Sequence, residues 1–150
     1  MPTIQQLYEA FSQVKLREEL PILIEQTGDS IAELVKGQLE KGKLSTDESI
    51  SPSYANKYYA KSKYNLNSAP GFGVPDVKVT GDLYAAIKVT AQDDEYDIES
   101  DVEYAEYPSI MQYGEDLLRM SEESKEKYCE DALGPAISNY IEEKTGIILS

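Results

Sequence analysis

The sequence contains no histidine, no tryptophan and a single cysteine, Cys129. Without histidine, neither a Ser-His-Asp nor a Cys-His catalytic arrangement can form, and the usual zinc sites are excluded as well. Cys129 cannot form an internal disulfide, and the acids near it (Glu126, Glu130 and Asp131) disfavour its thiolate. We therefore expect no catalytic residue, no metal and no cofactor. A carboxylate-based hydrolase is the enzyme class left open, and we rank it last.

Basic residues are scarce, since 14 Lys and Arg stand against 28 Asp and Glu, a formal net charge of −14. Such a chain repels phosphate, so we expect no nucleic-acid binding through its overall field. No apolar run approaches the roughly 20 residues needed to cross a bilayer. No charged-then-apolar leader is recognisable at the N-terminus. These absences predict a soluble protein that is made in a cytoplasm.

The length of 150 residues predicts a single domain. Tyrosine is its abundant aromatic, with 12 copies against two phenylalanines. Tyrosine suits surfaces that are buried in one state and wet in another, although ordinary sheet composition explains the count equally well. We divide the chain into four segments: 1–42, helical; 43–74, an extended arm; 75–104, a turn and β-hairpin; and 105–150, mainly helical.

The first segment is predicted to be helical from residue 3 to residue 41, because apolar residues recur there every three or four positions. The pattern indicates two pieces joined near Glu19–Pro21, with Pro21 in the first turn of the second piece. Gly28 indicates a bend, and Gly42 is the expected stop.

From Lys43 to Val74 the periodicity disappears, and Ser, Asn, Pro and Gly accumulate. Connections of this length are usually functional or disordered, but a disordered linker would carry few aromatics. We therefore predict an ordered arm that packs on something. Its candidate interface residues are Tyr54, Tyr58, Tyr59, Lys61, Lys63 and Tyr64.

Lysines and tyrosines interleave in this arm, because Lys57, Lys61 and Lys63 lie among the tyrosines. The pattern superficially suggests a stacking site for single-stranded nucleic acid. Against a net charge of −14, we favour docking on an acidic surface, such as the acidic strand of a neighbouring copy.

The third segment predicts a hairpin. Thr80 can cap a short helical turn that begins at Gly81, and strand 87–91 is followed by a turn at 92–94 and a returning strand, 95–102. The returning strand carries acids at every second position, which places them on one face. These acids are Glu95, Asp97, Glu99, Asp101 and Glu103.

This acidic face has three interpretations: a solvated outer face, a wall for a basic partner, or a lining that keeps DNA from sticking as it passes. The stretch Asp93–Ile98 begins like a calcium loop. It lacks the glycine required at the sixth position and the spaced terminal glutamate, so we interpret it as a strand.

The last segment predicts a short helix at Pro108–Tyr113 and a longer one capped by Ser121, with two glutamates in its first turn. Gly134-Pro135 interrupts the apolar stripe of the longer helix, so we expect a kink or two abutting helices. Gly146 supplies its C-terminal stop.

Three blocks between roughly residues 38 and 128 carry a family pattern in order. The first is Gln38–Gly42 followed by Ile50–Ala55 and Lys61, the second is Val79–Ile87, and the third is Tyr113–Glu123. Together they resemble the tail-completion or head–tail joining (neck) proteins of tailed bacteriophages. Ala86 stands where serine is common in that family, and Arg119-Met120 replaces the usual glycine-leucine.

The resemblance implies an α+β fold in which N-terminal helices and a C-terminal helix pack on a small antiparallel sheet. It also implies a non-enzymatic virion protein that forms a homo-oligomeric ring in the neck, joins the portal or adaptor to the tail and lines the DNA channel. The implied partners are other copies of the chain and the portal, adaptor and tail proteins. The alternative is a small acidic adaptor or inhibitor that binds a basic protein through the acidic strand.

Overall fold

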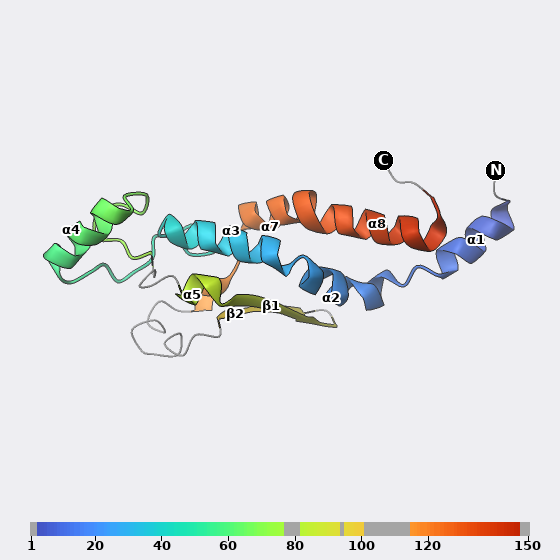
Figure 1. Ribbon diagram of the computed structural model, residues 1–150, viewed down its shortest axis with the longest axis horizontal. Coiled ribbons are helices and arrows are strands. Elements are labelled where there is room, and N and C mark those ends of the chain that lie inside the picture. Colours follow the sequence, from blue (N-terminus) through green and yellow to red (C-terminus); the bar gives the residue numbers. More distant parts are fainter. Residues whose placement is uncertain (1–2, 77–81, 94, 101–114, 148–150) are drawn as a thin grey trace.

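The computed structural model describes residues 3–76, 82–93, 95–100 and 115–147. Helices and a two-stranded antiparallel sheet form an elongated α+β fold (Figure 1). The middle layer contains α2 (Leu16–Gln26) and α3 (Gly28–Glu40), with the sheet on one side and the C-terminal helices on the other. The predicted α+β class is confirmed, and the C-terminal helices contact the N-terminal helices on the side away from the sheet.

The N-terminal segment forms three helices, and the predicted join near Glu19–Pro21 is wrong. The first helix, α1 (Ile4–Ser12), begins with a capping box formed by Thr3 and Gln6. The breaks lie at residues 13–15 and at Thr27, so Pro21 lies inside α2. Pro21 removes one backbone donor and crowds the preceding turn, yet the helix continues through it. The bend predicted near Gly28 is confirmed, because α3 begins at this residue.

The core is centred on α3, where Ile31, Val35 and Leu39 are completely buried. Their spacing of four residues places them on one face of the helix. Ile50 and Leu83 pack against the same cluster from other segments. Burying each of these side chains stabilises the fold by about 1.5–3 kcal/mol, so α3 is the helix that the other elements cover.

A buried glutamine connects α3 to the start of the C-terminal helices. The side-chain amide of Gln38 donates to the carbonyl of Arg119 at 2.8 Å, and its oxygen accepts from the backbone N–H of Ser121 at 2.9 Å. Both polar groups of the side chain are therefore satisfied, as burial requires.

The predicted arm is not extended throughout. After Gly42, whose φ of +67° ends the helix as predicted, an isolated bridge joins Lys43 and Ser49, and residues 57–66 form the helix α4 (Lys57–Leu66). Asn56 caps this helix, because its side chain accepts hydrogen bonds from the backbone N–H groups of Tyr58 and Tyr59. The periodicity missed α4 because Ala60 is the one residue of the helix that is buried.

The predicted hairpin is confirmed. The short helix α5 (Asp82–Ala85) leads into β1 (Ile87–Gln92), which pairs with β2 (Glu95–Ser100) through a register that sets Val89 opposite Ile98. Asp93 has a φ of +54°, as the tight turn requires. The predicted cap at Thr80, the end of the acidic strand at 101–103 and the predicted helix at 108–113 lie outside the described residues.

The C-terminal segment is one long helical rod with a π-helical interruption. A 3-10 turn, η2 (Glu115–Leu118), precedes α7 (Glu122–Tyr128), which Ser121 caps as predicted. The π-helical segment η3 (Cys129–Leu133) then leads into α8 (Gly134–Thr145), and Gly146, with a φ of +70°, ends the rod. The interruption predicted at Gly134-Pro135 is found as the π-helical segment that ends at Leu133, directly before the start of α8 at Gly134.

Candidate interface surfaces

The helix α4 lies at one end of the elongated molecule, beyond the end of α3 (Figure 1). Its C-terminal residue is followed by Asn67, whose side-chain amide donates to the carbonyl of Glu40 at 2.7 Å. The Lys63 ammonium lies 2.8 Å from the carboxylate of Asp76, and 15% and 6% of the two side chains remain exposed. These contacts attach α4 to the end of the core helix.

Asp76 also connects this region to α5, because its carbonyl accepts a hydrogen bond from the Tyr84 hydroxyl. Tyr84 is buried. Burial, reinforced by the nearby carboxylates of Asp76 and Glu40, raises the pKa of Tyr84 well above its ordinary value. The region therefore contains a polar network that holds Lys63 and Tyr84 inward.

The outward side of α4 and of the loop after it exposes large apolar side chains. Tyr58 is 86% exposed and Leu66 is 84% exposed, and Tyr59, Tyr64 and Phe72 are also exposed. Ring contacts hold part of this group: Tyr54 and Tyr59 meet edge to face with their ring centroids 5.0 Å apart, and the centroids of Tyr64 and Phe72 are 6.0 Å apart. The α4 surface is the name we give to the exposed residues of this region, which are Tyr58, Tyr59, Tyr64, Leu66, Phe72, Lys57 and Lys61.

The structure separates the predicted interface lysines. Lys61 is exposed and belongs to the α4 surface, whereas Lys63 is held in the largely buried pair with Asp76. Two apolar residues of the surface, Leu66 and Phe72, were not among the predicted candidates. Leu66 could have been identified from its spacing to Tyr58, because residues eight positions apart lie on similar sides of a helix.

The acids of the returning strand share one face, as predicted. Glu95, Asp97 and Glu99 are exposed, while Ile98 and Ser100 are partly buried on the opposite face. The hydroxyl of Ser100 donates to the carbonyl of Leu83 at 3.1 Å. We call the three exposed carboxylates the acidic face. Asp101, the fourth candidate, lies outside the described residues.

The register of the hairpin sets Lys88, Thr90 and Gln92 directly opposite the acidic face. Three carboxylates against one lysine leave this surface negative. It lies on the sheet, away from α4 (Figure 1), so one copy does not bring its own two predicted surfaces together. Among the described residues, no group of three or more His, Cys, Asp or Glu side chains is placed to hold a metal ion.

A third surface was not predicted as an interface. On α1, Ile4 is 87% exposed and Tyr8 is 72% exposed, and Phe11 is half exposed. Their spacing of four and three residues puts them on one side of the helix, and we call them the α1 surface. Periodicity identified the helix, but it could not show that this side faces solvent.

Cys129 is an exposed free thiol at the start of η3. No helix within the described residues is long and apolar enough to cross a membrane. Comparison of the chain with protein-family models, curated proteins and solved structures finds no significant match.

Proposed function

We propose that this chain is a structural assembly protein whose copies form a ring in the neck of a tailed bacteriophage. There it joins the portal or adaptor to the tail. The role is carried by surfaces and uses no catalysis, metal or cofactor. The observation that carries the proposal is the α4 surface, an ordered group of exposed aromatic side chains at the end of an elongated molecule.

The α4 surface has the composition of an interface core. Tyrosine and phenylalanine are enriched where proteins meet, and large exposed apolar groups in a single region mark interaction sites more often than scattered ones do. The cap at Asn56 and the ion pair between Lys63 and Asp76 hold the helix in place. Ordering these side chains before binding lowers the entropy that association must offset.

The acidic face suits the second part of the proposal, a passive channel for DNA. Carboxylates at Glu95, Asp97 and Glu99 repel phosphate, so a ring that turns them inward would let a genome slide without adhering. In this role the chain binds no nucleic acid sequence, and its partners are its own copies and the neighbouring portal, adaptor and tail proteins. The protein would then be found in the virion.

The proposal is tested by mass measurement of the purified protein over a range of concentrations, alone and with portal complexes, and by its presence in purified particles. We expect assemblies of several copies. Substituting Tyr58→Glu with Leu66→Glu should reduce them, and Ile22→Glu, at an exposed position on α2, is the matched control. A protein that stays monomeric with portal complexes, and that is missing from particles, would contradict the proposal.

The exposed carboxylates favour a second candidate, a small acidic adaptor or inhibitor that binds one basic protein. This role requires the acidic face and not the α4 surface. Charge-neutralising Glu95→Gln, Asp97→Asn and Glu99→Gln together would abolish binding of the basic protein, whereas the Tyr58 and Leu66 substitutions would leave it unchanged.

A further inference from the structure

We propose that copies of this chain associate head to tail, with the α4 surface of one copy docked on the α1 surface of the next. This inference rests on the proposed self-assembly and names the two surfaces that make the contact. It concerns a helix, α1, to which the sequence assigned no interface role.

The α1 surface is largely uncovered by the described part of its own chain. No residue of α1 is buried, although the helix is held near α8, where the backbone N–H of Lys15 donates to the Tyr140 hydroxyl at 3.0 Å. Ile4, Tyr8 and Phe11 are exposed along the helix. Covering such a side stabilises a complex in proportion to the apolar area removed from water.

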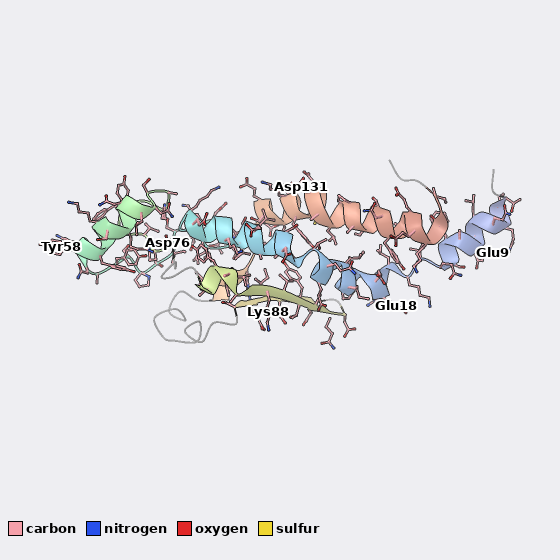
Figure 2. All side chains as sticks on the ribbon, in the orientation of Figure 1. Glu9, Glu18, Tyr58, Asp76, Lys88 and Asp131 are labelled. Atoms are coloured by element: carbon pink, nitrogen blue, oxygen red, sulfur yellow. The ribbon has the colours of Figure 1, made fainter. Side chains whose placement is uncertain are left out.

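The two surfaces cannot meet within one molecule. Figure 2 shows Glu9 of α1 and Tyr58 of α4 at opposite ends of the long axis. When the α4 surface of one copy contacts the α1 surface of another, the resulting dimer still has one uncovered α1 surface and one uncovered α4 surface. Such an arrangement continues until it closes as a ring or extends as a filament.

Charge complementarity selects a second copy as the occupant. The charged residues of the α4 surface are two lysines, Lys57 and Lys61, in a chain whose net charge is −14, whereas Lys63 is paired with Asp76. In α1, Glu9 is the one charged residue, and it directly follows Tyr8. Docking therefore brings Lys57 and Lys61 toward a carboxylate.

The same charges disfavour the symmetric alternatives. Pairing two α4 surfaces would bring Lys57 and Lys61 of one copy toward the same lysines of the other, and pairing two α1 surfaces would oppose two copies of Glu9. Like charges brought together at an interface reduce affinity for the wrong partner. The unlike pair is thus the favoured one.

Two double variants test the inference, because each disables one surface. The α1 variant carries Tyr8→Glu and Phe11→Glu, and the α4 variant carries Tyr58→Glu and Leu66→Glu. All four positions are exposed, so circular dichroism and urea unfolding should show an intact fold. Native mass spectrometry then measures the species formed by wild type, by each variant and by an equimolar mixture.

We expect wild type to assemble and each variant alone to be monomeric, with self-association weakened by at least about tenfold. The mixture should form a one-to-one dimer that grows no further. In that dimer the intact α4 surface of one variant meets the intact α1 surface of the other, and the two substituted ends repel.

Other outcomes overturn the inference. If wild type assembles and either variant alone does so equally well, the pairing of α1 with α4 is wrong while the proposed assembly role stands. A mixture that stays monomeric would also contradict it. If wild type itself is monomeric at every concentration and with portal complexes, both the inference and the proposed function fail.

Discussion

The hydroxyl groups of Thr27 and Tyr128 lie 2.7 Å apart, although 101 residues separate them in the sequence. The Thr27 hydroxyl also bonds to the carbonyl of Leu23 at 2.7 Å, so the Tyr128 hydroxyl is the natural donor to Thr27. Thr27 marks the break between α2 and α3, and Tyr128 is the last residue before η3. The bond therefore joins the irregular points of two helical layers.

A double-mutant cycle measures this bond. Thr27→Val should leave the Tyr128 hydroxyl without its partner, and Tyr128→Phe should remove the donor. We expect each substitution to lower the free energy of unfolding by about 1 kcal/mol, and the double variant to lose less than the sum. Urea unfolding provides the measurement, and strictly additive losses would show that the two side chains act independently.

A second prediction concerns alkaline pH. Because the folded state raises the pKa of Tyr84, it holds this proton more tightly than the unfolded chain does. The resulting stability is fully present below about pH 10, the pKa of an unfolded tyrosine, and is lost as the pH rises above that value. Tyr84→Phe should therefore flatten the decline in unfolding free energy above about pH 10.

Tyr128 contributes to the same alkaline decline, because burial raises its pKa as well. Tyr58→Phe is the matched control, since 86% of Tyr58 is exposed, and its pH profile should follow wild type. If the Tyr84→Phe protein shows the wild-type slope, burial of this hydroxyl does not govern the alkaline loss.

A third prediction separates two lysines that are two residues apart. Lys63→Met removes the partner of a buried carboxylate, Asp76, and should lower the free energy of unfolding by about 2–4 kcal/mol. Lys61→Glu should leave stability within about 0.5 kcal/mol of wild type but weaken self-association. Urea unfolding measures stability, and sedimentation measures self-association. If Lys63→Met kept full stability but impaired assembly, Lys63 would belong to the interface and not to the fold.

A fourth prediction compares two glycines. A Cβ at Gly42 would lie 2.5 Å from the Cβ of Pro70, at a φ of +67°, so Gly42→Ala should destabilise the fold by about 1–3 kcal/mol. A Cβ at Gly37, inside α3, meets nothing within 4 Å. Gly37→Ala should therefore stabilise the protein by about 0.5–1 kcal/mol. Thermal unfolding measures the stability of both variants. Equal changes in stability would show that the positive φ and the close contact at Gly42 do not require glycine there.

Features with a strictly local cause were predictable from the sequence. A cap at Ser121, a stop at Gly42 and a hairpin with alternating acids each depend on a few adjacent residues, and the structure contains all three. The helix α4 was missed because it packs mainly through Ala60 and Lys63 and so has no apolar stripe. A helix that is held by one small residue and one ion pair has no regular spacing of apolar residues in its sequence.

The candidate surfaces were predictable only in part. The sequence made Tyr58, Lys61 and Lys63 equal interface candidates. The structure exposes Tyr58 and Lys61 but pairs Lys63 with Asp76, a partner that is 13 residues away and meets it only in the fold. The α1 surface shows the same limit. The spacing of apolar residues indicates that a helix has an apolar side, but whether other elements cover that side depends on the tertiary structure.

The π-helical segment η3 has a consequence for which changes in chain length the protein tolerates. The N–H of Gly134 bonds to the carbonyl of Cys129, five residues earlier, and a Cβ at Gly134 would lie 2.7 Å from that oxygen. Because the wider π-helical turn holds one extra residue, deleting one residue there would restore a regular helix and leave the orientation of all that follows nearly unchanged. The same deletion inside α7 would rotate the following residues by about 100° and turn Tyr140 away from Lys15. The segment η3 is therefore the place in the rod that best tolerates the loss of a residue.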